Sequence, residues 1–354
     1  MIAPSSVSRR PRFRLFPRRD EWRAVAKRWA IAAGVVAVFC LLVWFFLLRM
    51  PGESWKGPLP PLDAAQTAVR GELEAAVRRL AVGIGERNTA WPARLEAAAR
   101  YVEGELAVCG TPRRVGYKLA EKSCDNVEVE IRGSSRPAEI VVVGAHYDSV
   151  RGTAGANDNA TGTAGVLALA RRLAGTSPAR TLRFVLFVNE EPPWFQTKYM
   201  GSLRYAQRCK DRGDEVAAML CLETLGCYRD DAGSQRYPAP GLSLAYPTTG
   251  DFVTFVGNVA SRDLTREIVG EFRRTATIPS EGAALPSGIP GVGWSDQWSF
   301  WEQGWPAVMV TDTAPFRYPH YHTAQDTIER IDFDRFARVV AGLVPVVDRL
   351  ANPR

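Results

Sequence analysis

The residues of this chain that could do chemistry begin with its histidines, which are few. The 354-residue sequence contains three, His146, His320 and His322. His146 closes an apolar run, Asp148 follows it, and a loop rich in Gly and Ala then leads to Asp158. Zinc in proteins takes imidazole nitrogen and carboxylate oxygen as ligands. A histidine at a strand end, followed by a carboxylate in a tight loop, therefore predicts part of a metal site.

Three further carboxylates follow two later apolar runs. Glu190 and Glu191 come after residues 182–188, and Glu223 comes after residues 216–222. Neighbouring residues at a strand end point in different directions, so one glutamate of the pair can bind a metal while the other handles a proton. One carboxylate can also bridge two ions, so five ligands suffice for two zinc ions with room for water. The five candidates are His146, Asp158, Glu191, Glu223 and His322.

An alternation of buried strands and helices is expected to position these side chains. Apolar or alternating runs predict strands at 127–131, 139–144, 182–188, 216–222 and 307–311. Helical spacing predicts helices at 63–84, 92–109, 161–174, 200–210, 295–303 and 334–351. This order indicates an α/β fold with a mixed, mostly parallel central sheet and helices on both faces. In such sheets sites form beyond the carboxyl ends of the strands, where the candidate ligands lie.

Ser295 stands where it would cap the helix predicted at 295–303. Two segments rich in Pro and Gly, 228–250 and 277–293, are expected to be irregular. Loops of this length are usually walls or lids of a functional site, or else disordered.

The N-terminal region is expected to anchor the chain in a membrane. Residues 29–48 form an uncharged apolar run of 20 residues, which at about 1.5 Å per residue crosses the roughly 30 Å hydrocarbon core. A cleaved signal peptide is the alternative, but its apolar region is usually about 7–15 residues long. The preceding basic residues should stay in the cytoplasm. The predicted organisation is a basic cytoplasmic tail (1–28), one transmembrane helix (29–48), a Pro-rich linker (49–62) and an extracytoplasmic domain (63–354), periplasmic or extracellular.

The net charge of +7 belongs to the tail. Residues 1–28 hold nine of the 45 basic residues and two of the 38 acidic ones, which leaves 36 of each sign in the rest of the chain. A neutral body offers no electrostatic footprint for a phosphate backbone. We therefore expect the domain not to bind nucleic acid.

The cysteines do not define a framework. Cys40 lies inside the apolar run, and the other five would face an oxidising compartment, where disulfides are permitted. An odd number leaves at least one thiol free or paired between chains, and the bridges cannot be assigned from the sequence. No CxxC pair occurs, which argues against a cysteine zinc site. The five are Cys109, Cys124, Cys209, Cys221 and Cys227.

Five short motifs in a fixed order resemble the M28 family of zinc aminopeptidases. Each is weak alone, but five in the right order are specific, and the resemblance covers roughly residues 65–350. It implies a zinc aminopeptidase fold and an exopeptidase that hydrolyses N-terminal residues from peptides with a free amino terminus. The motifs are GAHYDS (144–149), GANDNATG (155–162), NEE (189–191), LETLG (222–226) and YHTAQDT (321–327).

The resemblance also implies how two Zn²⁺ ions would be held. His146 and Glu223 would bind one ion, and Glu191 and His322 would bind the other. Asp158 would bridge the two, and a hydroxide bound between them would attack the peptide.

Three further assignments follow from the same resemblance. Glu190 would be the general base, and Asp148 would orient His146. His322, and not His320, matches the histidine of the family's YHT motif. Spacing alone does not distinguish between these two histidines.

Two positions depart from the family pattern. Glu223 stands where many members have Asp, and Gln297 stands where His is common. Gln297 is not at a ligand position, so we expect an effect on the pocket and not a loss of activity.

Tyr318 could donate a hydrogen bond to an oxyanion or simply pack. The preferred N-terminal residue, the physiological substrate and the oligomeric state are not predicted.

Two other functions remain open on the same fold. One is a glutaminyl-cyclase-like enzyme that uses a single zinc, and the other is a receptor-like, non-catalytic relative. Retention of all five candidate ligands favours the two-metal enzyme over both.

Overall fold

The computed structural model describes residues 18, 20–119 and 122–353. The described residues form two compact units, divided between Phe46 and Leu47. The first contains helix α1 (Trp22–Val43), which continues as a π-helical turn to Leu48. The 27 residues of Trp22–Leu48 are long and apolar enough to cross a membrane, although a signal sequence would meet the same two criteria. Most of the predicted basic tail lies outside the described residues.

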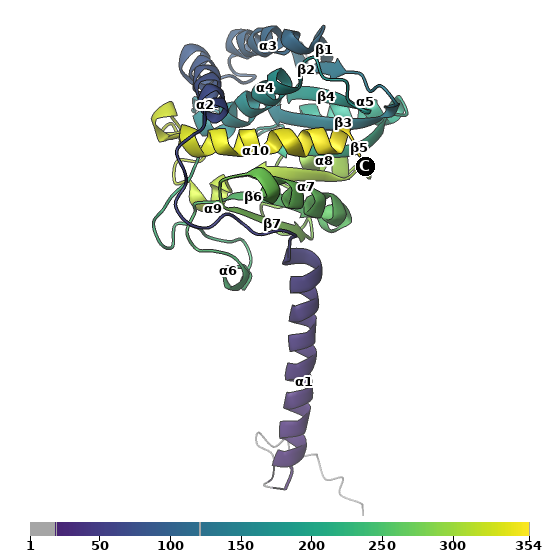
Figure 1. The fold of residues 1–354 in the computed structure, drawn as a ribbon, viewed down its shortest axis with the longest axis vertical. Helices are drawn as coiled ribbons and strands as arrows, with labels where there is room; N and C mark the ends of the chain where they lie inside the picture. Colours follow the sequence, from purple (N-terminus) through teal and green to yellow (C-terminus); the bar gives the residue numbers. More distant parts are fainter. Residues whose placement is uncertain (1–17, 19, 120–121, 354) are drawn as a thin grey trace, which may run out of the picture. The chain divides into compact units, whose positions relative to one another are not determined.

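The second unit is built on one eight-stranded mixed sheet (Figure 1) with the strand order β1-β2-β4-β3-β5-β8-β6-β7. Strands β4, β3, β5 and β8 run parallel in the centre, and β2 and β6 pair antiparallel with β4 and β8. The predicted α/β fold with a mixed sheet is confirmed. The strands are β1 (Arg113–Leu119), β2 (Lys122–Ile131), β3 (Arg136–His146), β4 (Arg180–Phe187), β5 (Glu215–Leu222), β6 (Val253–Asn258), β7 (Ser280–Leu285) and β8 (Ala307–Thr311).

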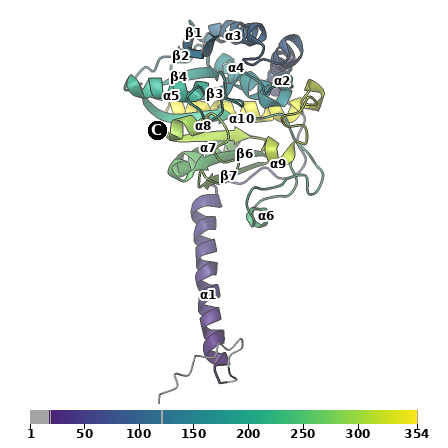
Figure 2. The ribbon, with the colours of Figure 1, turned by 180° about the vertical axis from the view of Figure 1, so that it is seen from behind.

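Helices cover both faces of this sheet (Figures 1 and 2). Side chains alternate along a strand, so Val141 and Val143 of β3 join the core under α2, α3, α4, α7 and α10. Ile140 and Val142 point the other way, into the core under α5 and α8. The helices are α2 (Ala64–Val77), α3 (Pro92–Leu106), α4 (Gly162–Leu173), α5 (Gly201–Asp211), α6 (Leu242–Ala245), α7 (Arg262–Thr275), α8 (Gln297–Trp301), α9 (Ala314–Arg317) and α10 (Phe333–Ala351).

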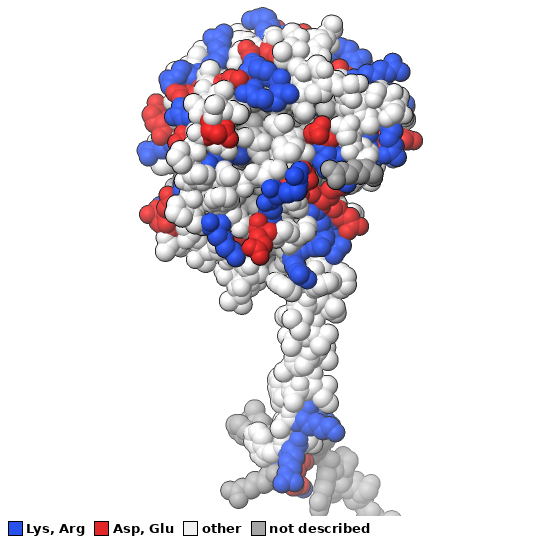
Figure 3. Space-filling model, viewed as in Figure 1, with Lys and Arg blue, Asp and Glu red and all other residues white. Residues whose placement is uncertain are grey.

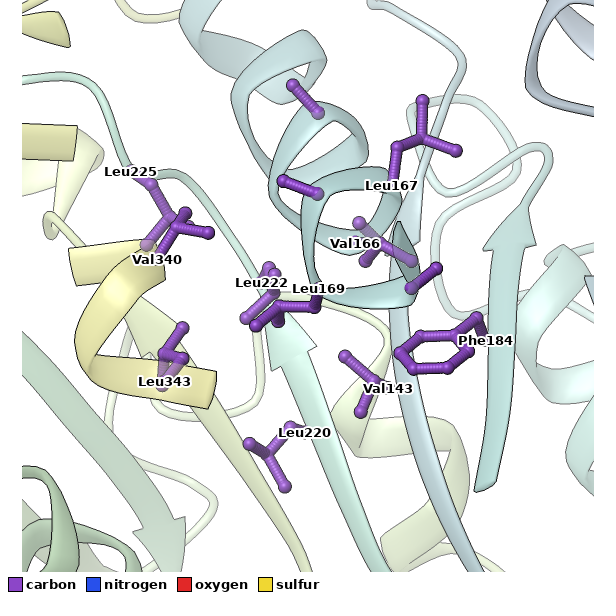
Figure 4. Close-up of a cluster of buried hydrophobic side chains, with 14 of the residues drawn as sticks. Val143, Val166, Leu167, Leu169, Phe184, Leu220, Leu222, Leu225, Val340 and Leu343 are labelled. Atoms are coloured by element: carbon purple, nitrogen blue, oxygen red, sulfur yellow. The ribbon is translucent and has the colours of Figure 1, made fainter. Parts of the chain in front are cut away.

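The larger core lies between the central strands and helices α4 and α10 (Figure 4). Val143 and Leu220 point from the sheet toward Leu169 of α4 and Leu343 of α10, and all four are fully buried. Strands buried on both faces are held rigidly by this packing. Their carboxyl ends are therefore a firm platform for polar side chains.

Two expectations about irregular segments had different outcomes. Residues 228–250 are irregular apart from the short helix α6, as predicted. The prediction for 277–293 was wrong, because this segment contains β7, which pairs in parallel with β6. Gly282 made the strand hard to predict, because glycine is uncommon inside strands. A Cβ at this position would lie 2.8 Å from Val269 of α7, so the close packing of this helix requires glycine. Strands β1 and β6 and helix α7 were also not predicted.

All six cysteines are free thiols, so the second unit holds together without a disulfide. On the face of this unit seen in Figure 3, basic and acidic side chains are intermixed. This mixture agrees with the even balance of charge beyond residue 28.

Candidate metal centre

His146 ends β3 and is fully buried. Its Nδ1 lies 3.5 Å from Oδ1 of Asp148. Its Nε2 lies 3.0 Å from Oε2 of Glu223 and 3.3 Å from Oδ1 of Asp158. The ring therefore turns one nitrogen toward the predicted orienting residue and the other toward two of the predicted ligands.

Asp158 stands between two histidines. Its Oδ1 faces His146, and its Oδ2 lies 3.0 Å from Nε2 of His322. The same nitrogen of His322 lies 3.3 Å from Oε2 of Glu191. His322 reaches this position with φ of 57°, a left-handed conformation that costs a non-glycine residue about 1 kcal/mol or more.

The structure thus brings all five predicted ligands together, in two groups that share Asp158. Within each group the potential ligand atoms lie within 4.8 Å of one another. His320 is not part of either group, and its ring packs edge-on against Tyr318. The groups are His146, Asp158 and Glu223, and Asp158, Glu191 and His322.

Glu190 lies beside the first group. Its Oε2 is 3.8 Å from Nε2 of His146. Its side chain is buried, yet among the described residues none donates a hydrogen bond to its carboxylate. The carboxylate is therefore free to act on a molecule held at the centre of the site.

Several polar atoms at the centre lie close together without forming hydrogen bonds. Among the described residues none forms a hydrogen bond with either ring nitrogen of His146 or either carboxylate oxygen of Asp158, although these atoms have polar neighbours at 3.0–3.5 Å. A buried polar atom in this state costs about 1–3 kcal/mol. Nitrogen and oxygen atoms that converge in this way without hydrogen-bonding to one another fit the ligands of a zinc site.

The acidity of the carboxyl groups points the same way. Burial raises the pKa of Glu191 to about 7 and that of Glu223 to about 8. Burial also opposes the charge of Asp158, but His146 and His322 facing it hold its pKa below the ordinary range. The site holds more carboxylates than its two imidazoles can neutralise, and a bound divalent cation would balance the excess negative charge.

Asp148 has a second role that the sequence did not indicate. Besides facing His146, its carboxylate accepts hydrogen bonds from the backbone N–H groups of Glu190 at 3.2 Å and Glu191 at 3.3 Å. One side chain therefore lies against Nδ1 of the histidine and also fixes the turn that presents both glutamates.

Asp326 was missed as a functional residue, although the YHTAQDT motif contains it. Its carboxylate accepts the backbone N–H groups of Asn157 at 2.8 Å and Asp158 at 3.1 Å. The Tyr318 hydroxyl donates to the same carboxylate at 3.0 Å, and the tyrosine is buried. Asp326 fixes the Asp158 backbone, and the Tyr318 hydroxyl is occupied in this network.

Glu223 is held by two side chains. Asn159 donates to its Oε2 at 2.8 Å, and the Ser295 hydroxyl donates to the same oxygen at 3.1 Å. Ser295 was predicted to cap a helix, which is wrong, because α8 begins at Gln297 and follows Asp296. Nothing in the local pattern around Ser295 indicates a contact with a residue 72 positions away.

A cavity of about 90 Å³ is lined by Glu223 and Tyr321 at the site. One water needs roughly 10–15 Å³, so this cavity has the size of a side chain. Its floor is one face of strands β8, β6 and β7, where Met309, Val256 and Ala283 are cross-strand neighbours. Its walls include residues 235–238, 242, 246, 290–292, 294 and 313–316.

A mixed α/β sheet with histidines and carboxylates gathered beyond its parallel strand ends defines a metal-dependent enzyme of the α/β class. Residues 126–347 match Peptidase family M28, and the chain belongs to this family. It is therefore a hydrolase of the metallo-aminopeptidase class.

Two curated relatives extend the match. The chain is 30% identical over 321 residues to YfbL of Escherichia coli (strain K12), covering 88% of this chain and 98% of that protein. It is 26% identical over 284 residues to leucine aminopeptidase 1 of Arthroderma otae, covering 76% of this chain and 68% of that protein.

Solved structures share the fold. BSAP, a zinc aminopeptidase from Bacillus subtilis, aligns with a TM-score of 0.60 at 13% identity, over 80% of this chain and 95% of that one. The glutaminyl cyclase of Fimbriiglobus ruber aligns with a TM-score of 0.58 at 19% identity, over 85% and 99%. At such identities these structures support the fold alone.

Proposed function

We propose that this protein is a dinuclear zinc aminopeptidase that removes N-terminal residues from peptides with a free amino terminus. Family membership supports the class of enzyme, and the position of Asp158 supports two metals, because its two oxygens face different histidines. His146 and Glu223 would hold one zinc, Glu191 and His322 the other, and Asp158 both.

The zinc pair, when bound, would supply an acidified water as nucleophile and polarise the scissile carbonyl. Glu190 would accept the proton of that water and return it to the leaving amine. Its position beside His146 and its lack of hydrogen bonds from the described protein support this role. Asp148 would keep Nδ1 of His146 turned away from the centre, so that Nε2 is the ligand nitrogen.

The apolar cavity next to Glu223 would receive the side chain of the N-terminal residue. Aromatic and aliphatic residues line it, including Leu242, Phe252 and Phe316. Apolar pockets with a few polar groups at one end are typical small-ligand sites. We therefore propose a preference for large apolar N-terminal residues.

Gln297 would act on this pocket and not on the metals. It is fully buried, and its Nε2 donates to the carbonyl of Val292 at 3.0 Å, in one wall of the cavity. This contact agrees with the expectation that the residue affects the pocket.

The decisive test is the substitution Glu190→Gln in the full chain. The variant should bind zinc like the parent but lose about 10²–10⁴-fold in kcat, measured with aminoacyl-nitroanilides, and chelation followed by zinc should abolish and restore the parent's activity. Glu302→Gln, at an exposed glutamate of the α8 region, is the matched control and should behave like the parent. Full activity in Glu190→Gln would rule out the assigned base.

A glutaminyl-cyclase-like enzyme with one zinc is the second candidate, and the fold shared with the Fimbriiglobus ruber enzyme is the observation that favours it. The zinc content of purified protein separates the two. One zinc per chain, with cyclisation of peptides that begin with glutamine and no release of amino acids, would replace our proposal. A non-catalytic receptor would show neither activity.

We further propose that α1 anchors the protein in the cell membrane, with the N-terminus in the cytoplasm and the domain at 63–354 on the periplasmic or extracellular side. Arg23, Lys27 and Arg28 before the apolar run support this orientation. Protease added to intact cells with a permeable outer surface should degrade the domain. Protection until the membrane is dissolved would refute the topology.

A further inference from the structure

A short segment ahead of the family match lies against the candidate metal centre. Residues 85–91, here called the clamp segment, connect the π-helical turn Arg78–Ile84 to α3. The match to the family begins only at residue 126. None of the motifs that carry the family resemblance includes the clamp segment.

Arg87 of the clamp segment is fully buried, and its guanidinium donates only to backbone carbonyls among the described residues. Its Nε reaches the carbonyl of Tyr147 at 2.6 Å, and its terminal nitrogens reach those of Ala154 at 2.5 Å and Gly155 at 2.9 Å. These carbonyls mark the beginning and end of the loop that joins β3 to Asp158. The guanidinium therefore links the two ends of this loop through hydrogen bonds.

The loop is closely packed beside that guanidinium. Gly155 has φ of 59°, and a Cβ there would lie 2.3 Å from the carbonyl oxygen of Asp158 and 2.6 Å from Cβ of Ser149. Two hydrogen bonds of 3.1 Å join Ser149 to Arg87. The backbone N–H of Ser149 donates to the carbonyl of Arg87, and the backbone N–H of Arg87 donates to the Ser149 hydroxyl. The position of Asp158 thus depends on close contacts that converge on Arg87.

The clamp segment also touches the loop that carries the paired glutamates. The hydroxyl of Thr89 accepts a hydrogen bond from Nε1 of Trp194 at 3.1 Å. The backbone N–H of Trp194 in turn donates to the carbonyl of Glu191 at 3.0 Å. One segment therefore supports both loops from which the candidate ligands project.

Arg87 is a cation in an acidic neighbourhood, but no carboxylate of the described residues lies at hydrogen-bonding distance from its guanidinium. Burial lowers its pKa to about 10, while the charges of Asp148, Asp326 and Asp158 favour the protonated form, so it is charged at neutral pH. Its N–H groups point at several carbonyl oxygens, and the planar guanidinium of arginine can donate to several acceptors at fixed angles better than the ammonium of lysine can.

We propose that Arg87 is a positioning residue that sets the zinc affinity of the centre by fixing the loop that presents Asp158, with Thr89 supporting the Glu191 loop. This inference rests on the proposed zinc function. It predicts the opposite sign from a simple charge effect. Removing a nearby positive charge would strengthen the binding of a dication, whereas loss of ligand position weakens it.

The test measures zinc affinity of the metal-free protein by competition with a chromogenic chelator. Arg87→Met, of similar length but without charge or donors, should weaken zinc binding about 10–100-fold, as loss of a residue that orients ligands does. Arg87→Lys keeps the charge but cannot span carbonyls at both ends of the loop, so it should weaken binding nearly as much. In zinc-saturated enzyme kcat should fall while KM stays near the parental value.

Arg183→Met is the matched control. Arg183 is a buried arginine of β4 that pairs with Glu130 and Asp214, away from the ligands. This variant should lose stability with unchanged zinc affinity. If Arg87→Met does not fold, Thr89→Val decides, and it should weaken zinc binding to a smaller degree.

Unchanged or tighter zinc binding in Arg87→Met, or in Thr89→Val if the first variant does not fold, would overturn the inference. So would parental zinc affinity in Arg87→Lys, because charge alone would then suffice. A parent protein that binds zinc as predicted, depends on Arg87 and yet hydrolyses no peptide would refute the proposed function while leaving this inference intact.

Discussion

Ala283 lies in the floor of the cavity proposed to receive the substrate side chain, two strands beyond Met309 of β8. With strands about 4.8 Å apart, it lies roughly 10 Å across the sheet from Met309. Ala283→Leu adds three carbons at this far end. At about 0.8 kcal/mol for each buried methylene, a substrate side chain that reaches the floor would lose about 2.4 kcal/mol of binding, or roughly 50-fold in kcat/KM.

The assay compares kcat/KM for phenylalanyl- and alanyl-nitroanilides. The phenylalanyl substrate should lose most of that 50-fold, whereas alanine, which is too short to reach the floor, should be hydrolysed at the parental rate. Ala245→Leu makes the same chemical change at an exposed position of α6 outside the cavity lining and should alter neither substrate. An equal loss for both substrates in Ala283→Leu would refute the reasoning, because the cavity would then not be the side-chain pocket.

Three further predictions concern the metal centre. His322→Ala should reduce the zinc content from about two ions per chain to about one by elemental analysis, whereas His320→Ala, at the matched histidine that packs on Tyr318, should leave it unchanged. Chelation should lower the melting temperature by roughly 8 °C when zinc had been present at about 1,000 times its Kd, because a bound ligand stabilises by mass action; no shift on removing zinc would contradict a resident metal. Tyr318→Phe should lower the free energy of unfolding in urea by about 1 kcal/mol and leave kcat nearly unchanged, because the Tyr318 hydroxyl donates to Asp326. A large loss of kcat at normal stability would instead indicate that this hydroxyl contacts the substrate.

The grouping of the site could be predicted from the sequence because of one geometric rule. His146 ends β3 and Glu223 follows β5, and these parallel strands are neighbours in the sheet. Glu190 and Glu191 follow β4, on the other side of β3. Residues that follow neighbouring parallel strands must lie close together. Apolar runs that end in acid or histidine therefore carried the prediction.

Supporting contacts could not be predicted in this way. Arg87 acts on carbonyls 60 to 68 positions along the chain, and Asp326 acts on backbone groups 168 and 169 positions away. No periodicity or local motif specifies such contacts, because they arise only when loops from separate elements pack. Ser295 shows the cost of local reasoning: its type and position suit a helix cap, but the fold places its hydroxyl on Glu223.

The folded arrangement of the charges also explains why a neutral charge count gave no sign of the acidic centre. Beyond residue 28 the chain has 36 charges of each sign, and a neutral count indicates nothing about an acidic centre. The fold separates these charges, with mixed signs on the face seen in Figure 3 and carboxylates gathered beneath the surface around His146. In a buried environment each of these carboxylates interacts more strongly with a cation than it would in water. The burial that makes the metal-free centre costly is therefore also what would give it affinity for zinc, and under our proposal residues such as Arg87 that hold the loops in place would influence metal binding without being ligands.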